Sequence, residues 1–208
     1  MKPINKWLVL AVVSLGILVS DQLTKYLAVA HLTFAFQAAG ARTTGEKIRA
    51  FVTQTNLLER GLADPRPVEV VHSFWQFRYT QNRAAAFGLL SGAPDWFRVP
   101  FFYLMTIAAV IFIIAYYRKV PTTQRYLQIT LALVLGGAVG NGIDRILHGY
   151  VIDFIDWHWF DPWWQKPNWH WPTFNVADSA LTVGLLMLAK EMFFARKPVG
   201  EQAGKPSP

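Results

Sequence analysis

Acidic and amide side chains lie at the ends of long apolar stretches of this sequence, at Asp21, Asn141, Asp144, Asp153, Asn175 and Asp178. Polar groups of this kind in or beside hydrocarbon cost several kcal/mol and normally mark a working site. Two carboxylates held close together in a low-dielectric setting cannot both ionise easily, so one of them keeps a proton. Such a pair can activate water as a base and protonate a leaving amine as an acid. The residues therefore suit peptide hydrolysis without a metal, a cofactor or a covalent intermediate.

Asp153 is a better candidate for this pair than Asp144. Asp153 is the one charged residue in the stretch 149–155, and desolvation would raise its pKa, although a solvated acid in a β-like loop is the alternative. Asp144 is followed by Arg145, which we expect to hold it ionised and paired. Asn141 shares a helix face with Asp144, three residues earlier. We therefore assign Asn141 and Asp144 an organising role.

Asp178 follows Asn175 by three residues at the start of the last apolar stretch. A carboxylate in the first turn of a helix is favoured by the helix dipole, so capping alone would explain it. If Asn175 is the N-cap, Asp178 is free to point inward. Asn82 precedes another apolar stretch and offers both a donor and acceptors, but an ordinary helix-entry turn would explain it equally well.

Asp21 and Lys25 are four residues apart, so they share a helix face and can form an ion pair. Lys25 could also extend toward the membrane surface. The pair is either a structural tie between helices or a contact for the substrate or a lipid head group.

Four apolar runs must position these side chains. The 208 residues are 53% hydrophobic and 16% charged, with mean hydropathy +0.24, whereas a soluble domain has about 25% charged residues. A membrane-spanning helix needs about 20 residues. We predict an all-α membrane protein with one domain (1–199), a disordered cytoplasmic tail (200–208) and four transmembrane helices, at about 6–28, 97–117, 126–147 and 176–195.

The first run also has features of a cleaved signal peptide. Lys2 and Lys6 form a basic start, and Ala28-Val29-Ala30 resembles a cleavage site. Because Asp21 and Lys25 interrupt the region before that site, and three more runs follow, we favour a retained helix.

Lysine and arginine gather before the first run, between the second and third, and after the fourth. Short basic loops stay in the cytoplasm, so we place both termini there and the segments 29–96 and 148–175 in the periplasm. Val68–Tyr79 is β-branched and aromatic, which predicts a small β region between the first two spans, and Ala41–Arg60 could be partly helical. The segment 148–175 holds six of the nine tryptophans and is predicted to lie along the outer membrane interface.

Charge and cysteine content exclude several classes of function. The net charge is +7, but the basic residues form no run. We therefore expect contact with anionic membrane phospholipid and no nucleic acid. The absence of cysteine excludes disulfides, thiol catalysis and cysteine-bound metal.

The polar blocks resemble those of lipoprotein signal peptidase (signal peptidase II), a family of aspartic proteases in the bacterial inner membrane. Five blocks stand in the family's order, at residues 21–25, 82–88, 140–145, 149–154 and 174–178. Compared with the family, the chain has insertions at about 36–70 and 157–171, and Ala84 in place of glycine. These departures leave the acids intact and concern the substrate range.

The resemblance implies a substrate, a site and an inhibitor. The substrate would be a diacylglyceryl-modified prolipoprotein, cut on the amino side of its lipidated cysteine, and globomycin would inhibit the reaction. The active site would lie near the periplasmic face. The resemblance makes Asp153 and Asp178 catalytic. The supporting residues that it implies are Asp21, Lys25, Asn82, Asn141, Asp144, Arg145, Asn175 and Ala177. The competing hypothesis is a transporter or assembly factor that uses the same acids as a proton relay.

Overall fold

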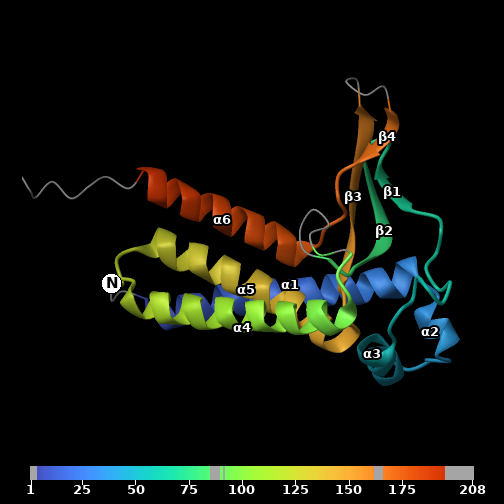
Figure 1. Cartoon of the computed structure of the whole chain (residues 1–208), viewed down its shortest axis with the longest axis horizontal. Helices are drawn as coiled ribbons and strands as arrows, with labels where there is room; N and C mark the ends of the chain where they lie inside the picture. The colour runs from blue at the N-terminus through green and yellow to red at the C-terminus, as the bar shows by residue number, and fades with distance from the viewer. Residues whose placement is uncertain (1–3, 85–89, 91, 162–165, 195–208) are drawn as a thin grey trace, which may run out of the picture.

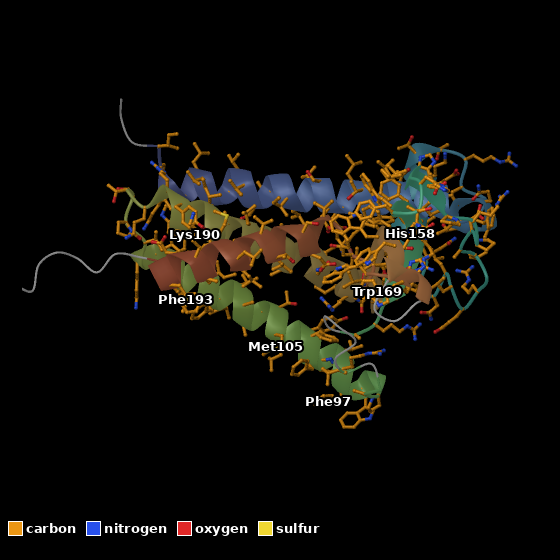
Figure 2. The ribbon with its side chains drawn as sticks, turned by 90° about the horizontal axis from the view of Figure 1, so that it is seen from above. Phe97, Met105, His158, Trp169, Lys190 and Phe193 are labelled. Carbon is orange, nitrogen blue, oxygen red and sulfur yellow. The ribbon has the colours of Figure 1, made fainter. Side chains whose placement is uncertain are left out.

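Four long helices form a bundle, and a small sheet crosses one end of it (Figure 1). This computed structural model describes residues 4–84, 90, 92–161 and 166–194. The long helices are α1 (Lys6–Leu32), α4 (Asp95–Lys119), α5 (Arg125–His148) and α6 (Val176–Phe194). Toward Asp95, α4 diverges from the other helices (Figure 2). The predicted tail, 200–208, lies outside the described residues.

Three of these helices are long and apolar enough to cross a membrane, over Lys6–Leu32, Trp96–Lys119 and Arg125–His148. The shorter α6 has 19 residues and carries three charged side chains, Asp178, Lys190 and Glu191. The outward faces of the helices are apolar, as with Leu15 of α1 and Leu186 of α6, both more than half exposed. These faces suit contact with lipid. The fourth span stays a prediction.

α5 packs against each of the other three long helices, and glycine makes the closest approaches possible. A Cβ atom at Gly137 would lie 2.5 Å from the carbonyl oxygen of Ala177 on α6. A Cβ atom at Gly136 would lie 2.9 Å from the carbonyl oxygen of Ser14 on α1. Small residues at helix interfaces allow such contact between backbones, and here they bring the polar ends of α1, α5 and α6 together.

Gly137→Ala is therefore expected to destabilise the protein. The added methyl group meets backbone, which cannot move aside without shifting α6, so we expect a loss of about 1–3 kcal/mol. The matched control is Gly16→Ala, on an exposed face of α1 where a Cβ atom has no neighbour within 4 Å. The control should be neutral or more stable by up to about 1 kcal/mol. Thermal unfolding in detergent checks both, and an unchanged midpoint for Gly137→Ala would contradict the packing argument.

The antiparallel sheet has the strand order β1-β2-β3-β4. The strands are β1 (Val68–Val71), β2 (Trp75–Asn82), β3 (Val151–Asp161) and β4 (Lys166–His170). The strands predicted over Val68–Tyr79 are confirmed. The β region predicted between the first two spans supplies β1 and β2, and the other two strands come from the tryptophan-rich segment. Ile152 and Phe154 are two residues apart and both lie in the apolar core, which is the spacing of side chains on one face of a strand.

Two short helices precede the sheet, α2 (Ala35–Ala38) and α3 (Thr44–Thr53). The side chain of Thr43 accepts a hydrogen bond from the backbone of Glu46, and the Glu46 carboxylate accepts one from the backbone of Thr43. This capping box fixes the start of α3, and the partly helical character expected within Ala41–Arg60 is confirmed.

The apolar core is divided in two. One cluster joins the end of α1 to α3 and the sheet, through residues such as Val29, Phe51 and Ile152. The other joins α1, α4 and α5 near the opposite end of the bundle, around Tyr117 and Leu131. The sequence-predicted polar residues lie between the two clusters.

Candidate active site

A sharp turn after α5 brings β3, which carries Asp153, back toward Asp144 on the helix. Gly149 ends the helix in the left-handed conformation, with φ 78°, and its N–H donates to the carbonyl of Arg145. Glycine adopts this conformation without steric cost. The chain then enters β3, where the N–H of Ile152 donates to Asp144 Oδ2 at 2.9 Å. Asp153 follows directly and pairs with Thr80 of β2.

The segment before α6 is pinned to the same strand. Phe174 N–H donates to the carbonyl of Ile155, and the Phe174 carbonyl accepts from Ile155 N–H at 2.9 Å. Asn175 follows, and its Oδ1 accepts from the N–H of Asp178 at 2.9 Å, while Asp178 Oδ2 accepts from the N–H of Asn175 at 3.2 Å. Asn175 therefore caps α6, as one interpretation predicted, and Asp178 takes part in the cap with only one of its oxygens.

Two buried amides connect the two candidate acids. Asn175 Nδ2 donates to Asp153 Oδ1 at 2.7 Å, and Asn141 Nδ2 donates to Asp178 Oδ1, also at 2.7 Å. The amides contact each other as well, since Asn175 Nδ2 lies 3.1 Å from Asn141 Oδ1. The bridge thus holds Asp153 and Asp178, 25 positions apart in the chain, beside one another.

Asp153 is almost fully buried, and its Oδ2 accepts no hydrogen bond from the described residues. Burial, followed by the neighbouring Asp178 carboxylate, raises the pKa of Asp153 well above its usual range, against the lowering effect of the Asn82 and Asn175 amides. The pair therefore favours a state with one proton, as the sequence predicted for two adjacent carboxylates.

Beneath the pair lies an ion cluster whose three charged side chains are fully buried. Lys25 Nζ lies 2.8 Å from Asp21 Oδ2 and 2.9 Å from Asp144 Oδ2. It also donates to Asn141 Oδ1 at 3.1 Å. Asp21 Oδ1 accepts the N–H of Ala177 at 3.0 Å. The cluster ties α1, α5, β3 and α6 together, which is the arrangement that the structural-tie interpretation of Asp21 and Lys25 predicted.

The expectation that Arg145 pairs with Asp144 was wrong. In the described part of the chain the ion-pair partner of Asp144 is Lys25. Adjacent residues of a helix point in different directions, so neighbours in sequence are not neighbours in space. Arg145 instead lies over the ring of Phe102, 4.5 Å from its centroid, and donates weakly to the Asn141 carbonyl at 3.4 Å.

Asn82 ends β2 opposite Val151 and lies near Asp153, so the structure brings it to the site. Its Oδ1 also accepts the N–H of Ala84 at 3.0 Å, which is the turn role considered as its alternative. The rest of this predicted block, 85–88, lies outside the described residues. Ala177 is fully buried beside Asp21.

Gln22 belongs to the site but was not singled out from the sequence. Its Nε2 donates to Asp144 Oδ1 at 2.9 Å and lies 3.2 Å from Asp21 Oδ2. The available signal was its position between Asp21 and Lys25 in the first polar block. Gln22 uses the Asp144 oxygen that Lys25 leaves open and shares Asp21 Oδ2 with Lys25, so each carboxylate of the cluster has more than one donor.

A family model described as signal peptidase (SPase) II matches residues 13–194. A lipoprotein signal peptidase of Anaeromyxobacter sp. (strain Fw109-5) is 47% identical over 191 residues, which are 90% of this chain and 85% of the relative. One from Syntrophotalea carbinolica is 43% identical over 132 residues, 64% of this chain and 76% of the relative.

Two solved structures titled as bacterial membrane enzymes share the fold. One, at 2.3 Å resolution, has a TM-score of 0.61 and 24% identity, over 95% of this chain and 94% of that one. The other, at 1.9 Å, has a TM-score of 0.60 and 26% identity, over 90% and 94% of the two chains. The bundle with a crossing sheet is therefore an architecture that membrane enzymes use.

Proposed function

Since this chain belongs to the signal peptidase II family, we propose that it uses Asp153 and Asp178 to remove the signal peptide from a diacylglyceryl-modified prolipoprotein. The observation that carries the proposal is the pair of amides, Asn141 and Asn175, that holds both carboxylates beside one another. The family is one of lipoprotein-processing proteases, which favours this function over a proton-coupled transporter or an assembly factor.

The two carboxylates divide the acid and base work. The raised pKa of Asp153 supports it as the group that holds the proton. Ionised Asp178 takes a proton from water as the water oxygen attacks the scissile carbonyl carbon, and Asp153 donates its proton to the carbonyl oxygen. The tetrahedral intermediate then collapses. The C–N bond on the amino side of the lipidated cysteine breaks, and the leaving nitrogen takes a proton from the acid pair.

The supporting residues fix the pair without joining the chemistry. Asn141 and Asn175 orient the carboxylates, and the Lys25 cluster holds the helices that carry them. Asp21 and Ala177 connect α1 to the start of α6. Asn82 approaches from β2, and Arg145 lies at the rim beside Phe102, where it can contact substrate.

We place the enzyme in the bacterial inner membrane with four spans and both termini in the cytoplasm. Lys6 Nζ donates to the carbonyls of Arg118 and Val120, both at 2.9 Å, so the basic start of α1 meets the basic loop after α4. The end of α6 lies at this end of the bundle too (Figure 1). Gathering of positive charge at one end supports a cytoplasmic location for it. The sheet and the candidate pair are then near the periplasmic face, where phospholipid and the acylated substrate meet them from the side.

The test is cleavage of paired precursors by the purified protein. We expect release of the signal peptide from the diacylglyceryl-modified precursor at least about tenfold faster than from the unmodified one, because remote binding energy of the acyl chains serves the transition state. Globomycin should block the reaction. Equal cleavage of both precursors would refute the proposed substrate, and no cleavage of either would refute the peptidase function.

A further inference from the structure

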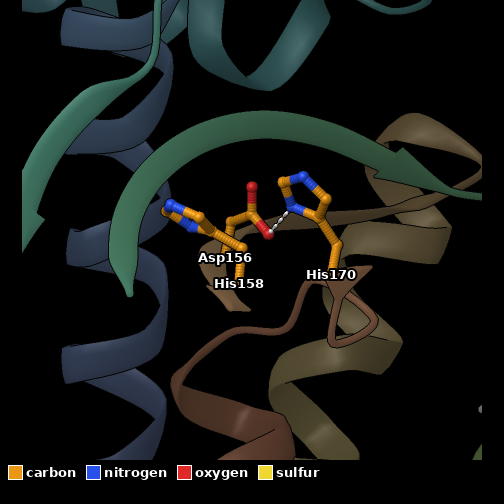
Figure 3. Close-up of side chains that lie close together, drawn as sticks. All are labelled: Asp156, His158 and His170. Carbon is orange, nitrogen blue, oxygen red and sulfur yellow. Dashed lines mark hydrogen bonds and ion pairs between the residues drawn. The ribbon is translucent and has the colours of Figure 1, made fainter. Parts of the chain in front are cut away.

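A second polar cluster lies on the β3–β4 hairpin, and the proposed function does not use it. Figure 3 shows the carboxylate of Asp156 between the imidazole rings of His158 and His170. Successive residues of a strand point to opposite faces, so Asp156 and His158 lie on the face of β3 opposite Asp153. The cluster is therefore separate from the candidate catalytic pair.

The strand register brings the three side chains together. His158 of β3 and His170 of β4 are direct cross-strand partners, and such partners have Cβ atoms about 4.5–5.5 Å apart. Their rings are stacked, with centroids 5.3 Å apart. Asp156 precedes His158 by two residues and so shares its face. One ligand atom from each residue lies within 4.8 Å of the other two.

We propose that Asp156, His158 and His170 bind one divalent transition-metal ion of the zinc type. Imidazole nitrogen and carboxylate oxygen are the donors that Zn²⁺ takes in cysteine-free sites, with three protein ligands and a water in the fourth position. In a tetrahedral site with bonds near 2.0 Å the ligand atoms lie about 3.3 Å apart. Side-chain rotations that bring the three ligand atoms, now within 4.8 Å of one another, to this spacing would close the site on an ion.

The surroundings of these three side chains are those of a preformed binding site. Asp156 is fully buried, and its Oδ1 lies 2.8 Å from His170 Nδ1. His158 Nδ1 is buried and has no hydrogen-bond partner among the described residues; a buried polar atom of this kind calls for a ligand. Gln76 Nε2 donates to Asp156 Oδ2 at 2.6 Å, which orients the carboxylate as outer partners of metal ligands do. His170 is one-third exposed, which gives an ion access.

One neighbour opposes the ion. Arg78 Nε lies 3.3 Å from Asp156 Oδ2, and its positive charge competes with a cation. The Arg78 side chain is 43% exposed, so it can turn into water when the ion enters. Arg78→Gln should therefore strengthen metal binding. The bound ion would join β4 to β3 and stiffen the tryptophan-rich hairpin.

The test is metal binding by the full-length chain without an affinity tag, stripped with a chelator and held in detergent. Titration calorimetry with Zn²⁺ should give one equivalent per chain, and Co²⁺ should give the intense absorption of a tetrahedral complex. The ion should also raise the thermal midpoint by a few degrees. His158→Ala and His170→Ala should each weaken binding at least about tenfold, while the matched control His72→Ala, on an exposed histidine outside the cluster, should not.

Each alternative result overturns the proposal. The first is a lack of stoichiometric binding by the unaltered chain. The second is a Co²⁺ spectrum equal to that of the free ion, and the third is binding that survives the paired substitution of His158 and His170. The cobalt spectrum needs no variant, so it decides the question even where a histidine variant fails to fold. Because these readouts do not involve cleavage, a negative outcome leaves the proposed peptidase function standing.

Discussion

Asp153→Asn is expected to abolish release of the signal peptide while leaving the protein folded in the membrane. The asparagine amide has the same shape and still accepts a hydrogen bond from Asn175 Nδ2, so the amide bridge between positions 153 and 178 is kept. It cannot supply the shared proton, and general acid–base catalysis contributes about 10²–10⁴-fold. The rate with a diacylglyceryl-modified precursor should fall by that factor. Asp178→Asn should give the same loss, because it removes the base.

The stability of Asp153→Asn should move in the opposite direction to its activity. Because burial raises the pKa of Asp153 well above its usual range, the folded state keeps a proton that the unfolded chain releases as pH rises. The native enzyme therefore loses stability as pH rises from about 4 toward the folded-state pKa. Asparagine carries no such proton. The variant should melt higher than the native enzyme at about pH 7, and the difference should shrink as the pH falls to about 4.

A matched control separates the loss of cleavage from any general effect of Asp→Asn changes. Asp64 lies outside the site, in an ion pair with the exposed side chain of Arg66, so Asp64→Asn should cleave at the native rate. Full activity of Asp153→Asn or of Asp178→Asn would remove that residue from the catalytic pair. A variant that is inactive and also unfolded in circular dichroism would contradict the claim that the fold does not need the acid.

The burial of Asp153 could be predicted from the sequence because its signal was local. Asp153 is isolated among apolar residues, and the structure buries it. Asn141 and Asp144 were placed on one helix face by their spacing, and both contact Lys25. Arg145 was misassigned for the complementary reason: adjacency in sequence carried more weight than direction on a helix.

The β3–β4 hairpin shows what local signals could not predict. The tryptophans indicated a membrane interface, yet Trp157, Trp159 and Trp169 lie in strands that extend the sheet. Trp159 lies opposite Trp169, and His158 lies opposite His170. That pairing depends on the register of two strands, which residue types alone do not specify. The histidine cluster therefore could not be predicted from the sequence without the strand register.

Lys25→Met is expected to cause the largest loss of stability among single substitutions in the site. Lys25, Asp21 and Asp144 are fully buried, and the lysine lies within 2.9 Å of both carboxylates. Methionine fills a similar volume but leaves two buried negative charges without a cation. Removing one partner of a buried ion pair costs about 3–5 kcal/mol. A drop of this size should appear as a much lower thermal midpoint and poor recovery of folded protein.

The control for charge removal is Lys119→Met, at the exposed end of α4 away from the site. A surface change of this kind is usually within about 0.5 kcal/mol of neutral. A native midpoint for Lys25→Met would show that the cluster does not hold the helices together.

Combining Lys25→Met with Asp21→Asn and Asp144→Asn should restore much of the lost stability, because no buried charge is then left unpaired. This triple variant also separates support from catalysis. Lys25 donates to Asn141 Oδ1, and Asn141 in turn holds Asp178. A folded triple variant with slow cleavage would therefore assign Lys25 a positioning role, acting on Asp178 through Asn141. A folded triple variant with native cleavage would restrict the cluster to holding α1, α5, β3 and α6 together.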